Sequence, residues 1–99
     1  MNLEKEVNDV LVEIASMFQS KNEQYRTDKD DLANFSKGAY LLGYHANEVG
    51  RFEALKAYVA KHIAKVYNGK LNDPKMDESI MDIAVYFIIA KVMHNRMQR

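Results

Sequence analysis

The 99-residue sequence has no cysteine, no tryptophan, one proline and four glycines. Without cysteine, the chain has no disulfide, no thiolate metal site and no cysteine nucleophile. The few glycines and the single proline leave little turn punctuation for a β fold. The glycines do not match either phosphate-loop pattern, and no H-E-x-x-H zinc motif occurs. The composition therefore excludes these site classes and favours an all-α protein.

The chain has no excess of positive or negative charge, because 14 Lys and Arg residues balance 14 Asp and Glu residues. Proteins that bind nucleic-acid backbones usually carry a basic excess, so we expect no nucleic-acid partner. The longest apolar run, 83–90, is too short to cross a bilayer, which needs about 20 helical residues. The charged start has no apolar targeting segment. These features predict a cytoplasmic protein without a membrane partner.

Apolar residues recur at three- and four-residue steps in four segments, and this spacing predicts four helices. We expect them over 3–23, 32–42, 47–67 and 75–96, the second being short. Residues 1–99 are thus predicted to form a single all-α domain of three long helices and one short one.

Local signals mark the ends of these helices. Asp30 or Asp31 is placed to accept amides at the start of the second helix. Gly43 is placed to end that helix in the left-handed region. Asp73 followed by Pro74 predicts a cap and a proline at the first position of the fourth helix.

The fourth helix is apolar nearly all round between Ile80 and Met93. That pattern predicts burial on most sides, at a bundle centre or in a subunit interface. A chain of this size also buries only about two-thirds of its unfolded surface, so it gains little stability alone. We therefore expect a homodimer or tetramer joined through the fourth helix.

Glu78 and Asp82 are the most informative polar pair. They are four residues apart, so both carboxylates project from one face of the fourth helix. Asp82 directly precedes the apolar run, where a buried carboxylate needs a cation as its partner. One possibility is Mg²⁺, shared with carboxylates of a facing helix. The other is an ion pair of Asp82 with Lys61, Lys65 or Arg51, while Glu78 benefits from the helix dipole.

Lys61 and Lys65 form a small basic face on the third helix. That face is suited either to phosphates or to the carboxylates of the fourth helix. His62 lies beside the apolar stripe, and we expect it to be a core-edge histidine hydrogen-bonded to a neighbour.

Several short motifs, taken in order, resemble those of the MazG-like all-α nucleotide pyrophosphatases, and above all a subgroup of small phage-encoded members associated with nucleotide modification. Lys21-Asn22-Glu23-Gln24-Tyr25 is similar to the Lys-x-x-Asp-Tyr motif that ends their first long helix, with Gln24 where the subgroup usually has Asp. Asn34-Phe35 and Lys61-His62 resemble their Asn-Phe and Lys-His pairs. Residues 77–86 resemble their last conserved helix.

The resemblance implies a helical oligomer that handles nucleoside triphosphates with Mg²⁺, which activates water for cleavage between the α- and β-phosphates. It implies Glu78 and Asp82 as metal ligands. The nucleotide-binding residues are then expected to be Lys61, Tyr25, Asn34, Lys21 and Lys65. Catalytic members carry a Glu-Glu-x-x-Glu cluster on an earlier helix, which this chain lacks. Both a weak pyrophosphohydrolase and a nucleotide-binding protein are therefore retained.

A second hypothesis is a non-enzymatic phage accessory protein that binds and inhibits a host defence protein. In that case the acidic loop 28–31 and the tyrosine-bearing second helix are the contact surfaces, and Glu78 and Asp82 are structural. A DNA-binding regulator is disfavoured, because the third helix mixes Glu48, Arg51 and Glu53 on its exposed face.

Overall fold

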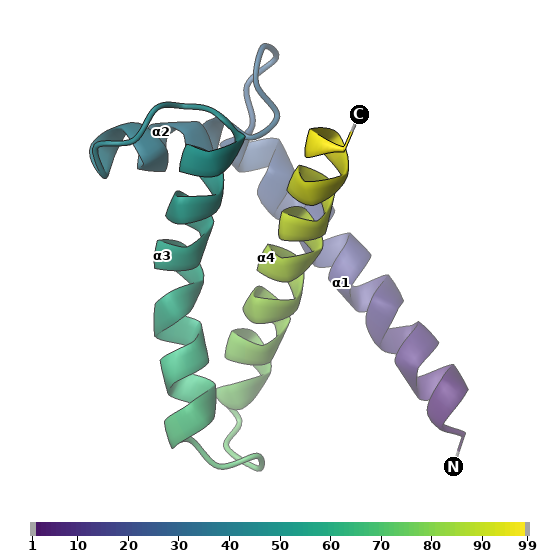
Figure 1. Cartoon of the computed structure of the whole chain (residues 1–99). Helices are drawn as coiled ribbons and strands as arrows, with labels where there is room; N and C mark the ends of the chain where they lie inside the picture. The colour runs from purple at the N-terminus through teal and green to yellow at the C-terminus, as the bar shows by residue number, and fades with distance from the viewer. Residues whose placement is uncertain (1, 99) are drawn as a thin grey trace.

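The structure, a computed structural model, describes residues 2–98, apart from the side chain of Tyr25. Over this part of the chain it contains four helices and no strand: α1 (Leu3–Tyr25), α2 (Ala33–Leu41), α3 (Glu48–Asn68) and α4 (Met76–Met97) (Figure 1). The prediction of an all-α fold with three long helices and one short helix is confirmed. Within these bounds, no helix is both long enough and apolar enough to cross a membrane.

Side chains cap two of the long helices at their N-termini. Asn2 accepts a hydrogen bond from the Lys5 amide before α1, and Asn47 accepts one from the Gly50 amide before α3. These contacts satisfy amides that have no partner within the helix, which is why each helix begins at this point.

Gly43 ends α2 as predicted, with a φ of 85°. Its amide donates to the carbonyl of Tyr40, and the amide of Tyr44 donates to the carbonyl of Ala39 at 2.8 Å. This pair of bonds is the Schellman arrangement, which requires the left-handed region at the glycine.

The start of α4 differs from the prediction. The helix begins at Met76, so Pro74 lies in the preceding turn rather than at the first helical position. Asp73 accepts a hydrogen bond from the Lys75 amide over 2.9 Å. The carboxylate of Asp73 therefore stabilises a turn that includes Pro74, and α4 begins two residues after that proline.

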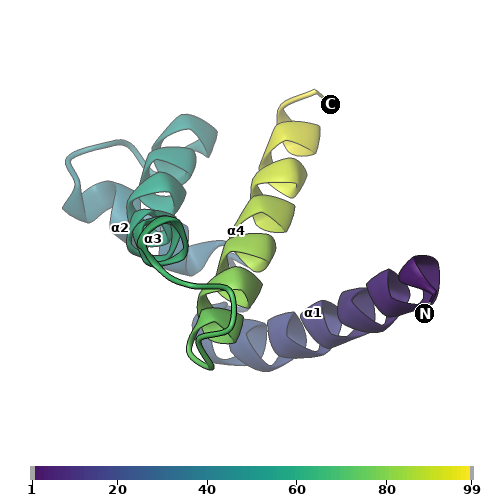
Figure 2. The same ribbon diagram turned by 90° about the horizontal axis from the view of Figure 1, so that it is seen from below.

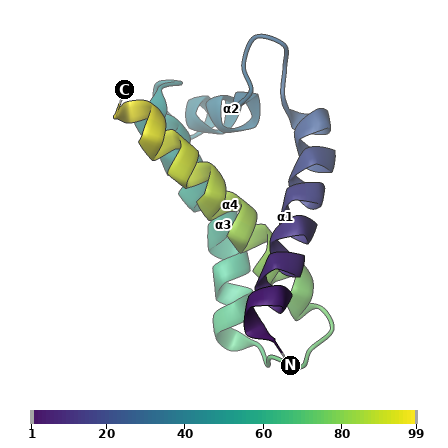
Figure 3. The ribbon, with the colours of Figure 1, turned by 90° about the vertical axis from the view of Figure 1, so that its right-hand side faces the viewer.

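Helices α3 and α4 lie side by side and antiparallel, and α2 crosses the N-terminal end of α3 (Figures 1 and 3). Their shared core contains Leu32, Phe35, Leu55, Val59 and Met93. All five are apolar, and Leu32 directly precedes α2 while the other four lie on the helices. Burying them is the main force that holds α2, α3 and α4 together.

Helix α4 lies between α3 and α1 (Figure 2). Ile14 of α1 packs against Met81 and Val85 of α4 in a second, smaller cluster. The N-terminal half of α1 runs away from this crossing (Figures 1 and 2), and its apolar residues Leu3 and Leu11 are exposed. Helix α1 is therefore attached mainly through its C-terminal half.

In the single chain, α4 is not buried at the centre of a bundle, because its residues Ile80, Phe87 and Ile88 are exposed. The alternative, burial in a subunit interface, stays a prediction. Only two helices pack closely along α4, and two neighbours leave one side of a helix uncovered.

Candidate functional site

A cleft of about 500 Å³ opens where the C-terminal half of α1, the start of α2, the middle of α3 and the length of α4 meet. Its walls combine aromatic and aliphatic side chains with charged and amide groups. The apolar lining is Phe18, Leu32, Phe35, Tyr58, Val85, Tyr86, Ile89 and Val92. The polar lining is Lys21, Asn22, Arg26, Asp31, Asn34, Lys61, His62, Glu78, Asp82 and Arg96. With His62 neutral, the cleft carries one positive charge in excess.

Asp82 is the buried charge of this cleft, with a side chain only 7% exposed. Its Oδ1 accepts a hydrogen bond from Nζ of Lys21 over 2.6 Å. Its Oδ2 lies 3.4 Å from Nε2 of His62. A carboxylate at this depth requires such partners, because its lost hydration must be replaced by charge and hydrogen bonds.

His62 is buried, as its position beside the apolar stripe predicts. Its ring lies 6.1 Å from that of Tyr86. Its Nδ1 is buried and has no hydrogen-bond partner in the described part of the chain. One ring nitrogen of His62 therefore faces Asp82, while the other is enclosed by the protein.

The cleft brings together most of the residues predicted from the sequence. Its lining includes Lys21, Asn34, Lys61, Glu78 and Asp82. Lys65, one turn beyond Lys61, does not line it. The side chain of Tyr25 lies outside the described residues. Five residues from four helices thus share one site, although they are spread over 61 positions of the sequence.

The cation partner of Asp82 differs from the three residues considered on spacing. Lys21 of α1 forms the ion pair, in place of Lys61, Lys65 or Arg51. Arg51 pairs instead with Glu48 on its own helix, over 3.1 Å.

The carboxylates do not build a complete metal site by themselves. Among residues 2–98, no three His, Asp or Glu side chains are grouped so that they could hold one ion. Asp82 already contacts Lys21 and His62, whereas Glu78 is exposed and forms no ion pair within the described residues. A Mg²⁺ ion held by protein groups alone does not fit this arrangement. A Mg²⁺ ion that is also bound by phosphate oxygens and water molecules needs only one or two protein carboxylates.

Three aromatic rings form one wall of the cleft. The ring centroids of Phe35 and Tyr58 are 5.8 Å apart, those of Phe35 and Tyr86 are 6.2 Å apart, and the two tyrosines are 6.5 Å apart. Tyr58 donates a hydrogen bond from its hydroxyl to the carbonyl of Asn34 over 3.1 Å. This bond and the close ring packing fix the position of the wall.

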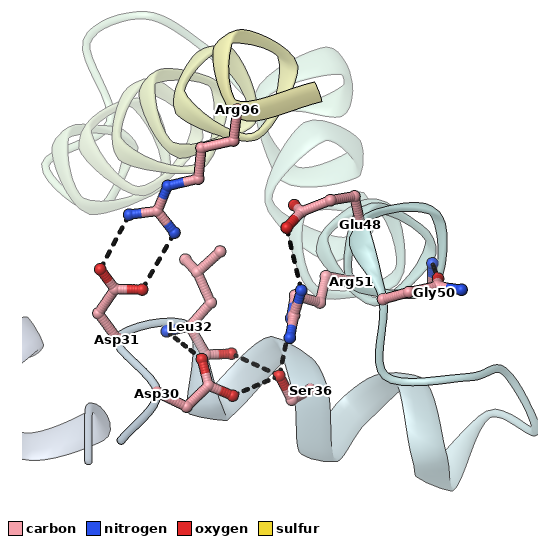
Figure 4. A network of polar contacts seen from close by, with 9 residues as sticks. Asp30, Asp31, Leu32, Ser36, Glu48, Gly50, Arg51 and Arg96 are labelled. Atoms are coloured by element: carbon pink, nitrogen blue, oxygen red, sulfur yellow. Dashed lines mark hydrogen bonds and ion pairs between the residues drawn. The ribbon is translucent and has the colours of Figure 1, made fainter. Parts of the chain in front are cut away.

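Arg96 and Asp31 close one end of the cleft with a two-pronged ion pair, at 3.1 and 2.9 Å (Figure 4). The hydrogen bond from Arg96 holds the pKa of the Asp31 carboxyl below its usual range. The same bond raises the pKa of the Arg96 guanidinium. Both directions agree with two opposite charges that stabilise one another's ionised form. The pair ties the loop before α2 to the last turn of α4.

A second polar network lies beside this ion pair (Figure 4). Asp30 accepts the amide of Leu32 over 2.9 Å and the hydroxyl of Ser36 over 2.6 Å. The Ser36 oxygen in turn accepts Nε of Arg51 over 2.8 Å. Asp30 therefore accepts the amide of Leu32, the residue that precedes α2, but no side chain caps α2 itself, so the predicted cap by Asp30 or Asp31 is wrong. Asp30 and Asp31 are both engaged within the chain, so the acidic loop offers fewer free carboxylates to a partner than its sequence suggests.

Sequence reasoning missed Arg26, Arg96 and the tyrosine wall as parts of the cleft. Arg96 lies 65 residues from Asp31, and no local spacing connects them. The sequence contains six tyrosines, but a high tyrosine content indicates core-edge residues as readily as a binding wall.

Neither family models, curated proteins nor solved structures give a match to this chain. Function is therefore inferred from the chemistry of the cleft.

Proposed function

We propose that the cleft binds a nucleoside phosphate. The observation that carries this proposal is an aromatic wall facing lysine and arginine side chains within one cavity of about 500 Å³. Aromatic rings offer stacking surfaces to a base, and lysine and arginine side chains pair with phosphate oxygens. A ligand with a flat aromatic part and an anionic part uses both features.

Within this proposal, Lys61 and Arg26 contact the phosphates. Both are exposed at the cleft, and neither forms an ion pair within residues 2–98. Lys21 and Arg96 are already paired with Asp82 and Asp31. The phosphates are therefore expected nearer to Lys61 and Arg26 than to the other two cations.

The base is placed against the wall that contains Tyr58 and Tyr86. Asn34 lines the same wall, and its side-chain amide carries both a donor and an acceptor for a base edge. Nothing in this arrangement selects one base over another, so the proposal names a nucleoside phosphate as the class of ligand.

In this proposal, Mg²⁺ binds together with the nucleotide. Bound to phosphate oxygens and water, it needs only a protein carboxylate at the edge of the cleft, and Glu78 supplies one. The MazG-like assignment and a weak pyrophosphohydrolase activity are proposed on the motif resemblance. The cleft geometry supports the binding step.

Thermal unfolding of the full chain in the presence of nucleoside mono-, di- and triphosphates, each with and without Mg²⁺, tests the proposal. A ligand that binds only the folded protein stabilises it by about 2.7 kcal/mol at a hundredfold excess over its dissociation constant. We expect a rise in the midpoint with a nucleotide and a smaller rise with inorganic triphosphate, which lacks the base. No shift with any nucleotide contradicts the proposal, and equal shifts with both ligands contradict the role of the aromatic wall.

Glu78→Gln tests the place of the metal. We expect this variant to lose most of the extra stabilisation that Mg²⁺ adds to the nucleotide, while nucleotide alone still binds. Asp77→Asn is the matched control, because Asp77 is exposed on the same turn but does not line the cleft. An assay for released pyrophosphate on the same samples then separates hydrolysis from binding.

A further inference from the structure

The single chain exposes more surface than its mass requires. Its accessible surface is 7673 Å², whereas a compact monomer of 11.4 kDa exposes about 5,800 Å². Its radius of gyration is 14.9 Å, against about 12.6 Å for a compact domain of this length. The excess is about 1,900 Å², and it agrees with the way in which the N-terminal half of α1 extends away from the other helices (Figures 1 and 2).

Exposed apolar side chains lie on both α1 and α4. We name this surface the outer apolar face and define it as Leu3, Val7, Val10 and Leu11 of α1 with Ile80, Phe87 and Ile88 of α4. All seven are exposed, and Phe87 and Ile88 are both 48% exposed. The α1 residues follow helical spacing and continue the stripe that buries Ile14 against α4. Large exposed apolar areas mark interfaces in soluble proteins.

We propose that a second copy of this chain covers the outer apolar face, so that the protein is a symmetric homodimer. If both copies bury the excess surface, the interface totals about 3,800 Å², within the range of about 2,000–5,000 Å² for obligate homodimers. The inference rests on α1 and the outer side of α4, and it is independent of the nucleotide proposal.

Charge complementarity indicates which helices meet. The first half of α1 carries Glu4, Glu6, Asp9 and Glu13 against Lys5 alone. After Asp82, α4 has no acidic residue and carries Lys91 and His94 besides Arg96, which is already paired with Asp31. In a two-fold dimer the same patch serves both copies. The acidic half of α1 in one protomer is therefore placed along the basic half of α4 in its partner.

Light scattering coupled to size exclusion, with the full chain over a range of concentrations, tests this proposal. We expect twice the mass of 11.4 kDa. Leu11→Asp and Ile88→Asp are each expected to weaken the dimer at least tenfold while helical circular dichroism is kept. Leu41→Asp is the control, because Leu41 is 71% exposed and lies on α2, outside the face. A monomer at every concentration overturns the proposal, and so does a dimer that neither aspartate weakens.

Disulfide trapping keeps the test valid if an aspartate variant fails to fold. The chain has no cysteine, so a Leu11→Cys chain mixed with an Ile88→Cys chain has one thiol on each partner. We expect oxidation to join the two different chains through residues 11 and 88. A mixture of Leu41→Cys with Ile88→Cys is expected to give no such product. Equal yields from both mixtures, or none from the first, overturn the proposed pairing of α1 with the partner's α4.

Discussion

Nζ of Lys21 on α1 lies 2.6 Å from Oδ1 of Asp82 on α4, and this ion pair connects two helices that share only a small apolar cluster. The Lys21 side chain is 46% exposed, whereas that of Asp82 is 7% exposed. Because both residues line the cleft, the contact that attaches α1 also shapes the proposed binding site.

This asymmetry of burial predicts unequal effects of the two single substitutions. Lys21→Met leaves a buried carboxylate with His62 as its remaining polar neighbour, and we expect it to cost about 1–3 kcal/mol of unfolding free energy, the penalty for a buried polar group that loses a partner. Asp82→Asn leaves a lysine that reaches water, and we expect it to cost less, about 1 kcal/mol. Urea unfolding of both variants and of the double variant gives the coupling energy, which we expect to exceed about 1 kcal/mol.

Lys5 and Asp9 provide the matched control for this cycle. They also form an ion pair, at 2.9 Å, but both are well exposed on α1. Such a pair contributes about 0.3–0.5 kcal/mol. If the two cycles give equal coupling energies, burial of Asp82 does not strengthen its contact with Lys21.

The ion pair of Asp31 with Arg96 predicts a pH dependence. Because the folded-state pKa of Asp31 is lowered, its contribution is complete above the unfolded value of about 3.9 and is lost as the pH falls through the folded value. The Asp31 side chain is 56% exposed, so solvent screening limits the contribution to about 1 kcal/mol at most.

Asp31→Asn is therefore expected to lower the unfolding free energy at pH 7, and the difference from wild type is expected to shrink as the pH falls below about 4. The raised pKa of Arg96 keeps that group charged across the whole range. Urea unfolding of both proteins at a series of pH values measures the difference. A difference that does not change with pH indicates that the variant acts through packing and not through charge.

Gly38 is a position where a better helix former is expected to destabilise the protein. Alanine in place of helical glycine normally gains about 1 kcal/mol. Here the added Cβ meets the Tyr58 hydroxyl, lies 2.8 Å from its Cζ, and is 3.1 Å from Cβ of Ala54. Tyr58 is packed against Phe35 and cannot move away freely.

We expect Gly38→Ala to lower the unfolding free energy by about 1–2 kcal/mol, because overpacking outweighs helix propensity. Tyr58→Phe in the same chain removes the nearest atom and is expected to recover part of the loss. Thermal unfolding of the two variants measures both effects. If Gly38→Ala raises the midpoint, the wall of the cleft has more room than the packing around Tyr58 indicates.

Local signals predicted the helices and several of their ends. Gly43 has the φ that its position requires, because the Schellman arrangement depends on neighbouring residues alone. Pro74 was predicted to be the first residue of α4, but the helix begins two residues later, at Met76. A turn that includes Asp73 competes with the helix start. Local chemistry fixes where a helix is favoured, and competing local contacts shift its ends.

The sequence indicated which residues lie at the cleft better than it indicated which of them contact one another. Helical spacing identified Glu78 and Asp82 as one face, and both line the cleft. The partner of Asp82 is Lys21, 61 residues away. That pairing depends on where α1 crosses α4, and this crossing is fixed by Ile14 and the apolar cluster around it. Spacing within one helix contains no information on such a crossing.

Lys61 and Lys65 provide the sharpest test of the site, because they are successive lysines on one face of α3 and only Lys61 lines the cleft. The sequence predicts both as phosphate contacts, whereas the structure shows only Lys61 in the lining of the cleft. We expect Lys61→Gln to reduce the nucleotide-induced rise in unfolding midpoint, with at least a tenfold weaker affinity, about 1.4 kcal/mol. Lys65→Gln removes the same charge one turn away and is expected to retain most of the rise, since Lys65 does not line the cleft and therefore makes no direct contact with the phosphates. Equal losses in the two variants indicate a diffuse basic surface in place of a defined phosphate contact.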